Sequence, residues 1–495
     1  MDLIIGDLSL INGLFLLLAL GLALGFEFVN GFHDTANAVA TVIYTNTLKP
    51  TYAVVWSGIW NLIGVLTSTG AVAFGIISLL PVELVVNAGS GAGFAMVFAL
   101  LISAIIWNLS TWYFGLPASS SHTLIGSILG VGLANSAVTG AAFGEGVNWE
   151  KAIEVFQSLL LSPPIGFMAA ALILLAAKVL LKNPALYQSP EGETPPPIWI
   201  RGLLILTCTG VSFAHGSNDG QKGMGLIMLI LIGILPSIYA LDLSIDAPTF
   251  VNLSEASKAA VVTLDKHSPP SLSVQGKEID VQLSSFLKSG NASDRTFSAL
   301  AAKNHAIADK LIGKNSFQEV SKEDRRSLRS DFYLLAKTID KLDRQSMFAD
   351  AAEQKTLINY KKQIQRVTEF IPDYVKVAVA LALGLGTIVG WKRIVVTVGE
   401  KIGKEHLTYA QGAAAELVAM STIATADRFG LPVSTTHVLS SGIAGTMIAN
   451  GSGIQTDTVR NLLLAWILTL PICMFLGALT FSADLFIVIH IFGLK

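Results

Sequence analysis

The residues of this sequence that are best suited to chemistry lie in the stretch EFVNGFHDTANAVATVIYTNT, which spans Glu27 to Thr47. The run LFLLLALGLALGF comes directly before it and holds no polar side chain. Ionisable groups within a membrane span cost at least ~2.5–3.5 kcal/mol each on insertion scales, so they are functional candidates by default. Grouped carboxylate, amide and imidazole side chains can hold a cation, carry a proton or bind an anion. The candidates in this stretch are Glu27, Asn30, His33, Asp34 and Asn37.

A weaker copy of this motif, HGSNDGQKG, begins at His215, and its Gly216 and Asp219 align with Gly31 and Asp34 of NGFHDTANA. Glycine permits a break in a helix, where backbone carbonyls and an Asp or Asn side chain can hold a cation. We therefore expect breaks at both glycines, with Gly223 as a further joint. The predicted coupling-ion residues are Asp34, Asn37, Asn218 and Asp219, with Gln221 as another neutral oxygen ligand and Lys222 as a partner for a carboxylate or an anion.

A second motif also occurs twice. GLPASSSHTLIGSILG, from Gly115, and GLPVSTTHVLSSGIAG, from Gly430, are identical at half of their positions. Pro favours the first turn of a helix, and the following Ser and Thr residues supply cap hydroxyls. A helix N-terminus with free N–H groups is an anion site that suits phosphate. Either copy alone is compatible with an ordinary capped helix, but recurrence in both halves favours a shared site for one tetrahedral oxyanion. His122 and His437 close the two motifs.

The composition requires a membrane. Of 495 residues, 52% are hydrophobic and 14% are charged, against roughly 25% charged residues in soluble domains. Several apolar runs reach the ~20 residues that a membrane-spanning helix needs. We expect spans near residues 9–30, 52–80, 93–113, 153–181, 202–241, 374–391, 408–426 and 459–480.

The repeated motifs predict two homologous halves. The Asp motif precedes the Gly-Leu-Pro motif in each half, and the second half separates them by 130 residues more. Of the 33 Lys and Arg residues, 19 lie between Asp242 and Asp373, which identifies an inserted extramembrane domain that is helical at least over 317–370. The expected organisation is a first membrane repeat (1–182), a linker (183–199), the start of the second repeat (200–241), the insertion (242–373) and the rest of the second repeat (374–495).

Loop charge predicts the orientation of the halves. Lys49, the cluster Lys178–Arg201 and the cluster Lys392–Lys404 are expected on the cytoplasmic side, and the insertion on the outside. This placement needs an odd number of crossings in each half, so the repeats are inverted. The predicted fold is an all-α polytopic membrane protein of about ten spans, with discontinuous helices and with re-entrant hairpins near 115–135 and 430–450. The two cysteines, Cys208 and Cys473, lie in apolar segments and predict no disulfide or thiolate metal site.

The motifs NGFHDTANAVATVIYT, IIWNLSTWYFGLPASSSHTLIG, FAHGSNDGQKGMGL and GLPVSTTHVLSS resemble those of the inorganic phosphate transporter (PiT) family, and most closely those of the low-affinity proteobacterial phosphate permeases. The resemblance covers both membrane halves. It implies a secondary symporter in a bacterial inner membrane, often a homodimer, and neither an enzyme nor a nucleic-acid-binding protein. It also implies no resident cofactor and no certain metal site.

The resemblance further implies phosphate contacts at the helix ends and a paired carboxylate motif. Proteobacterial members are regarded as proton-coupled and able to carry neutral divalent metal–phosphate complexes, for example with Mg²⁺, whereas other members use sodium. The supporting residues expected around the site are Glu27, Asn30, His33, His122, His215, Gln221, Lys222 and His437. The implied phosphate contacts are Ser119, Ser120, Ser121, Ser434, Thr435 and Thr436.

Three other functions compete with phosphate symport. A permease for another oxyanion, such as sulfate, would use the same helix ends, but only a protonated phosphate can donate a hydrogen bond to Asp34 or Asp219. An intramembrane hydrolase would need Ser120 or Ser121 with His122, and adjacent residues on a helix do not face each other. An anion channel could share the site, but coupled movement of a cation would exclude it.

Overall fold

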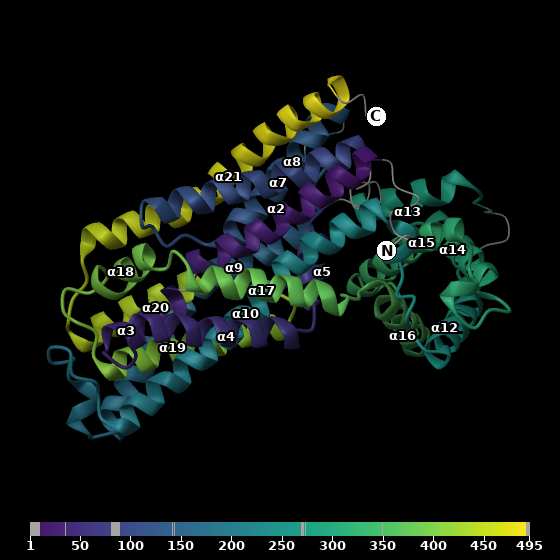
Figure 1. Ribbon diagram of the computed structural model, residues 1–495. Coiled ribbons are helices and arrows are strands. Elements are labelled where there is room, and N and C mark those ends of the chain that lie inside the picture. The colour runs from purple at the N-terminus through teal and green to yellow at the C-terminus, as the bar shows by residue number, and fades with distance from the viewer. Residues whose placement is uncertain are drawn as a thin grey trace. The chain divides into compact units, whose positions relative to one another are not determined.

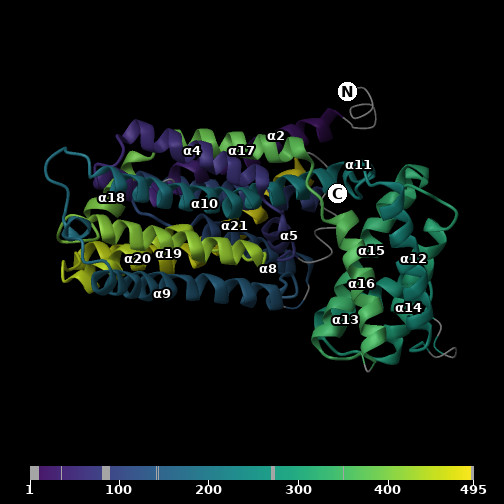
Figure 2. The same ribbon diagram turned by 90° about the horizontal axis from the view of Figure 1, so that it is seen from below.

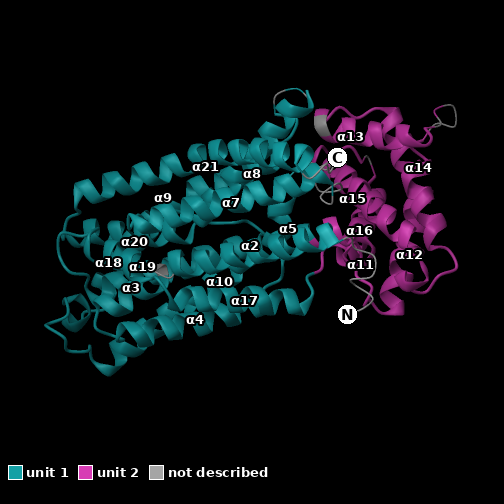
Figure 3. Ribbon diagram, turned by 45° about the horizontal axis from the view of Figure 1, so that its top comes forward, with its two compact units in different colours: residues 1–230, 371–495 teal, residues 231–370 magenta. Residues whose placement is uncertain are grey.

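The computed structural model describes residues 10–34, 36–80, 90–140, 142, 144–268, 272, 274–348 and 350–491, without the side chains of residues 36, 37 and 288. Over these ranges the regular secondary structure is helical, and one isolated antiparallel bridge joins Gly403 and Ile454. The chain divides into two compact units, Met1–Ile230 with Ile371–Lys495, and Leu231–Phe370, coloured teal and magenta in Figure 3.

The first unit is a bundle of long helices (Figure 1). Its first half contains α2 (Leu10–Asp34), α3 (Ala36–Tyr44), α4 (Pro50–Thr67), α5 (Ala71–Ile77), α7 (Gly91–Tyr113), α8 (Ser120–Thr139) and α9 (Trp149–Leu180), followed by the short 3₁₀ helix η1 (Pro184–Tyr187). Its second half contains α10 (Ile198–Ile234), α17 (Asp373–Ile388), α18 (Lys392–Glu400), α19 (Tyr409–Arg428), α20 (Thr435–Asn450) and α21 (Thr456–His490).

This unit has the surface of a membrane protein. Within the described ranges, five helical stretches are long and apolar enough to cross a bilayer, and up to seven if each bent helix pair counts as one span. Large apolar side chains project outward from them, including Met168 of α9 (56% exposed) and Phe475 of α21 (66% exposed). Lipid, and not water, is the solvent in which such faces are stable. The protein is a polytopic α-helical membrane protein, and each predicted span contains a helix of the structure.

The predicted helix breaks at Gly31 and Gly216 are wrong. Helix α2 continues through Gly31 to Asp34, and α10 runs unbroken from Ile198 to Ile234 through Gly216 and Gly223. These glycines allow helices to approach closely: a Cβ atom at Gly31 would overlap the carbonyl oxygen of Leu383 in α17, and one at Gly216 would overlap that of Asn61 in α4. Small residues serve this purpose at helix contacts within membranes.

The last helix of each half packs against the other half. Helix α9 packs along α20, and α21 packs along α8 (Figures 1 and 2). Glycines permit both contacts, because a Cβ atom at Gly130 of α8 would overlap Met474 of α21, and one at Gly445 of α20 would overlap Phe167 of α9. The two halves therefore use the same kind of helix pair at equivalent places in the chain.

The second unit is the charged insertion. It contains α11 (Pro236–Tyr239), α12 (Ala247–Asp265), α13 (Lys277–Ser289), α14 (Asp294–Leu311), the 3₁₀ helix η2 (Phe317–Glu319), α15 (Lys322–Arg344) and α16 (Ala351–Thr368), so it is helical well beyond 317–370 (Figure 2). Apolar residues of the segment 317–370 form part of its core and are buried: Val320, Leu328, Phe332, Leu335, Ile339 and Leu342.

The second unit and the predicted insertion (242–373) overlap over most of their length. The compact unit starts at Leu231 and ends at Phe370. Arg329 is buried and donates hydrogen bonds to the carbonyl oxygens of Ala240 and Thr368, and the Asp242 N–H donates to the Val367 carbonyl (2.9 Å).

Candidate ion-binding site in the membrane unit

The site is built around Asp34, the last residue of α2, which is 1% exposed. Ser120 of α8 donates a hydrogen bond to Oδ2 of this carboxylate (2.8 Å), and Thr436 of α20 donates one to Oδ1 (2.8 Å). His33 Nδ1 lies 3.1 Å from Oδ1, and its Nε2 lies 3.0 Å from the Thr111 hydroxyl. One carboxylate thus joins the first turns of two helices that come from different halves of the chain.

A buried ion pair from α10 completes the centre of the site. Lys222 Nζ lies 2.8 Å from Asp219 Oδ2 and donates a hydrogen bond to Ser120 Oγ (2.9 Å). His215 Nε2 lies 3.2 Å from the same Asp219 oxygen, and both charged residues are 1% exposed or less. Asp219 Oδ1 accepts no hydrogen bond from the described residues. This arrangement leaves an unused acceptor beside a fixed cation, as an ion-binding site requires.

The Gly-Leu-Pro motifs have the same backbone in both halves. Gly115 and Gly430 adopt left-handed φ angles of 66° and 65° at the C-terminal ends of α7 and α19. The next residue closes each end, because the Leu116 and Leu431 N–H groups both donate back to a carbonyl five residues earlier (2.9 Å each). This is the Schellman pattern of helix termination. The two prolines precede the caps of α8 and α20, so the prediction that they occupy the first helical turn is wrong.

The Ser and Thr residues of the motifs occupy four kinds of position. Ser119 and Ser434 are N-caps, whose side chains accept from the N–H groups of His122 (3.2 Å) and His437 (3.1 Å). Ser121 donates to the Val433 carbonyl of the other motif (2.8 Å). Ser120 and Thr436 reach the carboxylate, and Thr435 is buried at the start of α20. Four of the six hydroxyl side chains therefore shape the helix ends or lie behind them.

His122 of α8 and His437 of α20 lie next to each other, with their ring planes tilted by 38°. Their ring centroids are 4.7 Å apart, and Trp466 of α21 stacks on His437 at 4.1 Å. His122 Nδ1 and His437 Nε2 have no hydrogen-bond partner among the described residues. These two imidazoles are therefore close to the site and keep a free ring nitrogen each.

The remaining predicted residues lie around this centre. Glu27 is fully buried against Gly223 of α10, and Asn30 donates to its Oε2 at 3.4 Å. Asn218 and Gln221 instead hold the second Gly-Leu-Pro segment, because Asn218 donates to the Leu431 carbonyl (3.1 Å) and Gln221 donates to Asp427. The side chain of Asn37 lies outside the described part of the structure.

Several buried polar residues were not predicted from the sequence. Asn61 of α4 lies 2.9 Å from His215 Nδ1, and Asn108 of α7 is fully buried. Glu416 of α19 is fully buried as well and accepts hydrogen bonds from the hydroxyls of Thr41 and Thr207. Glu416 is a carboxylate within a predicted span, so the same rule that selected Asp34 should have found it.

Asp34, His215 and Asp219 could hold a cation together. One ligand atom from each lies within 4.8 Å of the others, and all three residues are buried. Carboxylate oxygens accept both sodium and divalent ions, and either carboxylate can instead take up a proton. The geometry provides a place for a coupling ion next to the hydroxyl groups of the helix ends, and it fits a proton or a metal cation.

Comparison with known proteins identifies the family. The sequence profile described as "Phosphate transporter family" matches residues 30–477. The chain belongs to this family. Its relatives include the low-affinity inorganic phosphate transporter PitA of Escherichia coli (strain K12), which is 42% identical over 95% of this chain and 96% of the relative. The low-affinity inorganic phosphate transporter of Buchnera aphidicola subsp. Acyrthosiphon pisum is 43% identical over 96% of this chain and 98% of the relative.

A solved structure has the same fold. The structure titled "The sodium-dependent phosphate transporter" aligns with a TM-score of 0.51 over 95% of this chain and 98% of that chain, at 18% sequence identity. The predicted family is confirmed by the profile and the relatives. These relatives are named as transporters, so the prediction that the chain is not an enzyme is confirmed too.

Proposed function

We propose that this protein is a secondary symporter that carries inorganic phosphate across the bacterial inner membrane, coupled to protons, by alternating access. Membership of the phosphate transporter family supports the substrate, and the bacterial relatives support the membrane. The observation that carries the site is the buried carboxylate of Asp34, which is hydrogen-bonded to Ser120 and Thr436 from the two helix N-termini. Phosphate would bind where these hydroxyls and Lys222 converge.

The charge of the site explains why a cation must travel with phosphate. Asp34 and Asp219 carry two negative charges, and Lys222 supplies one fixed positive charge within hydrogen-bond distance. A phosphate anion adds further negative charge to a buried place, and like charges disfavour each other there. Protonation of a carboxylate or entry of a cation removes this repulsion. Each ion then favours binding of the other, which is reciprocal coupling.

The unpaired Asp219 Oδ1 also supports phosphate over sulfate. A protonated phosphate can donate a hydrogen bond to this acceptor, whereas sulfate has no proton to donate. A neutral divalent metal–phosphate complex would relieve the repulsion in another way, because the metal brings its own positive charge. Sodium-coupled phosphate symport is the alternative, with Asp34 and Asp219 as sodium ligands and His215 beside them.

The two halves support an alternating-access mechanism. The matching helix ends at Gly115 and Gly430, and the exchanged packing of α9 and α21, are what two inverted repeats around one site would produce. Rocking of one half against the other would expose the site to each side in turn. Homodimer formation stays a prediction from the family resemblance, and native mass spectrometry of the purified protein tests it.

The test is uptake of radiolabelled phosphate into proteoliposomes that contain the purified protein. An imposed proton gradient should drive phosphate uptake in the absence of sodium, and protons should enter the vesicles together with phosphate. Excess sulfate should not reduce phosphate uptake. The Asp219→Asn variant should lose gradient-driven uptake while remaining folded. Uptake that requires sodium would transfer the coupling role to sodium, and uptake that no gradient accelerates would make the protein a channel and refute symport.

A further inference from the structure

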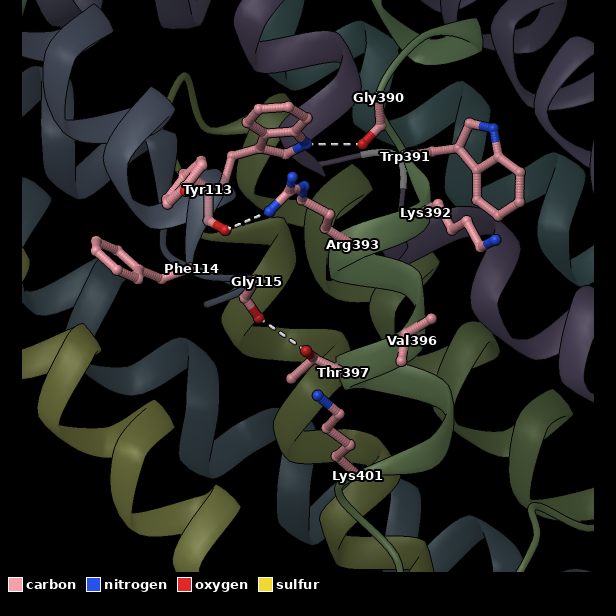
Figure 4. Close-up of a pocket in the computed structure, with 11 residues that line it drawn as sticks. Tyr113, Phe114, Gly115, Gly390, Trp391, Lys392, Arg393, Val396, Thr397 and Lys401 are labelled. Atoms are coloured by element: carbon pink, nitrogen blue, oxygen red, sulfur yellow. Dashed lines mark hydrogen bonds between the residues drawn. The ribbon is translucent and has the colours of Figure 1, made fainter.

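A cavity with a basic lining lies where the C-terminal ends of α7 and α17 meet α18, and it shares no residue with the central carboxylates or with Lys222. We call it the interfacial pocket; it has a volume of about 660 Å³ (Figure 4). The residues that line it are Trp112, Tyr113, Phe114, Gly115, Gly390, Trp391, Lys392, Arg393, Val396, Thr397 and Lys401. Three of these side chains are cationic, four are aromatic and none is acidic.

Arg393 is held at the centre of the interfacial pocket. Its guanidinium carbon lies 5.1 Å from the ring centroid of Trp112 and 5.0 Å from that of Tyr113, and Nη1 donates to the Tyr113 carbonyl (2.8 Å). A guanidinium has five N–H donors in a planar fork that matches a phosphate group. Cation–π contacts fix its position. The guanidinium of Arg393 is thus held in a fixed orientation, and its other N–H groups can donate hydrogen bonds to an oxyanion.

The walls of the pocket are tied to the backbone. Trp112 Nε1 donates to the Gly390 carbonyl (2.7 Å), and the Thr397 hydroxyl donates to the Gly115 carbonyl (2.7 Å). Figure 4 shows Lys401 extending from the end of α18 toward Thr397, while Lys392 lies near the other end of the helix. In Figure 4, Arg393 and Lys401 lie on the side of α18 that faces Gly115, whereas the Lys392 amine points away from Arg393. The apolar residues Ile394, Val395 and Val398 of this short helix are buried.

The position of the pocket indicates which anion it binds. Two membrane helices end there, and Tyr113 and Phe114 next to it are 61% and 73% exposed. Aromatic residues concentrate at the membrane–water interface, and basic clusters just beyond a span bind anionic lipid headgroups. In the other half, α5 packs against Gly430 in the equivalent place and carries no charged residue. Helix α5 therefore differs from α18, which begins with Lys392 and Arg393.

We propose that the interfacial pocket binds the phosphodiester headgroup of an anionic phospholipid. Arg393 and Lys401 bind the phosphate oxygens, Lys392 adds attraction at the rim, and the acyl chains lie along the exposed faces of Tyr113 and Phe114. A bound headgroup bridges α18 to the end of α7, the helix that leads into Gly115 and the first Gly-Leu-Pro motif. This site is independent of the proposed transport mechanism.

The test is a titration of the purified full-length protein with phospholipid in neutral detergent. The readout is the midpoint temperature of thermal unfolding. Phosphatidylglycerol should raise the midpoint, and phosphatidylcholine should not. Each cation near a membrane surface contributes roughly a fivefold change in affinity, so Lys392→Gln and Lys401→Gln should each weaken the apparent affinity for phosphatidylglycerol about fivefold. Lys182→Gln removes an exposed lysine outside the pocket and should leave that affinity unchanged.

Inorganic phosphate distinguishes this pocket from the central site. Any stabilisation by inorganic phosphate should be the same in the wild type and in both lysine variants. Equal stabilisation by the two lipids, or unchanged phosphatidylglycerol affinity in folded Lys392→Gln and Lys401→Gln, would overturn the proposal. A phosphate effect that disappears with these two lysines would reassign the pocket to free phosphate. Arg393→Lys, which keeps the charge but loses the fork, should weaken lipid binding without loss of the folded protein.

Discussion

Lys222 is the residue whose removal should affect the site most strongly. It is 1% exposed, and its Nζ lies 2.8 Å from Asp219 Oδ2 and 2.9 Å from Ser120 Oγ. Lys222→Met leaves the buried Asp219 carboxylate without its fixed cation. Loss of one partner from a buried ion pair typically costs about 3–5 kcal/mol. We expect Lys222→Met to lower the stability of the protein by this order of magnitude and to abolish phosphate uptake.

A second variant isolates the electrostatic part of this effect. Asp219→Asn with Lys222→Met removes both charges, and replacement of a buried pair by neutral groups is often close to neutral. The double variant should therefore regain at least half of the stability that Lys222→Met loses, although it should not transport. The assay is the fraction of protein that stays monodisperse after heating in detergent, with the exposed Lys182→Met as the matched control.

The order of thermal stability among the variants tests whether Lys222 and Asp219 stabilise the protein as a coupled pair. The expected order of stability is wild type and Lys182→Met, then the double variant, then Lys222→Met. If Lys222→Met unfolds at the same temperature as the wild type, the ion pair adds nothing to folding. If the double variant is less stable than Lys222→Met, then the lysine and the aspartate act separately, and the site is not a coupled charge centre.

Three further predictions follow from other parts of the molecule. Gly216→Ala should destabilise α10 against α4 by about 1–3 kcal/mol, because a Cβ atom overlaps the Asn61 carbonyl; Gly202→Ala on the same helix, where nothing lies within 4 Å, is the control for thermal stability. Glu416→Gln should keep the protein folded, whereas Glu416→Leu should cost about 1–3 kcal/mol in the same assay, because it removes the acceptor of the buried Thr41 hydroxyl, while Thr207 keeps its bond to the Leu204 carbonyl (3.1 Å). Burial raises the pKa of Asp340, but the hydrogen bond from Lys361 (2.6 Å) outweighs it and the pKa is lowered. The stability that this pair gives to α15 and α16 is therefore present above the unfolded pKa of about 4 and is lost as the pH falls through the lower folded value; hydrogen exchange should show this acid-dependent loss in the wild type and less of it in Asp340→Asn.

The fold of the membrane unit could largely be predicted because the decisive signal is local. Helices α9 and α21 each contain a long apolar stretch, so composition alone identifies them as spans. The role of the glycines, in contrast, could not be predicted from the sequence. Gly31 and Gly216 have the same sequence signature whether they break a helix or let two helices touch, and only the position of the neighbouring helix decides.

The repeated motifs selected residues that the structure brings together, but they did not predict how these residues pair. Asp34, Asp219, Ser120, Lys222 and Thr436 were all expected near one another, yet nothing in the sequence assigned Ser120 to Asp34 or made Ser119 a cap. The contact between Thr436 and Asp34 joins residues 402 positions apart. Which hydroxyl of an SSS or STT run faces the carboxylate depends on the rotation of the helix, and that is set by packing against the other half.

The resulting contacts constrain how the proposed transport can work. Ser120 donates to Asp34 and accepts from Lys222, so the hydroxyl that would bind phosphate is already engaged on both sides. Thr436 is engaged by the same carboxylate. In the proposed mechanism, phosphate would have to compete with Asp34 for both hydroxyls. Protonation of Asp34, or a cation beside it, would weaken these two hydrogen bonds and would make the hydroxyls available as donors to phosphate. We infer that the coupling ion acts by freeing the phosphate ligands as well as by balancing charge, which explains why a carboxylate lies directly at the helix ends.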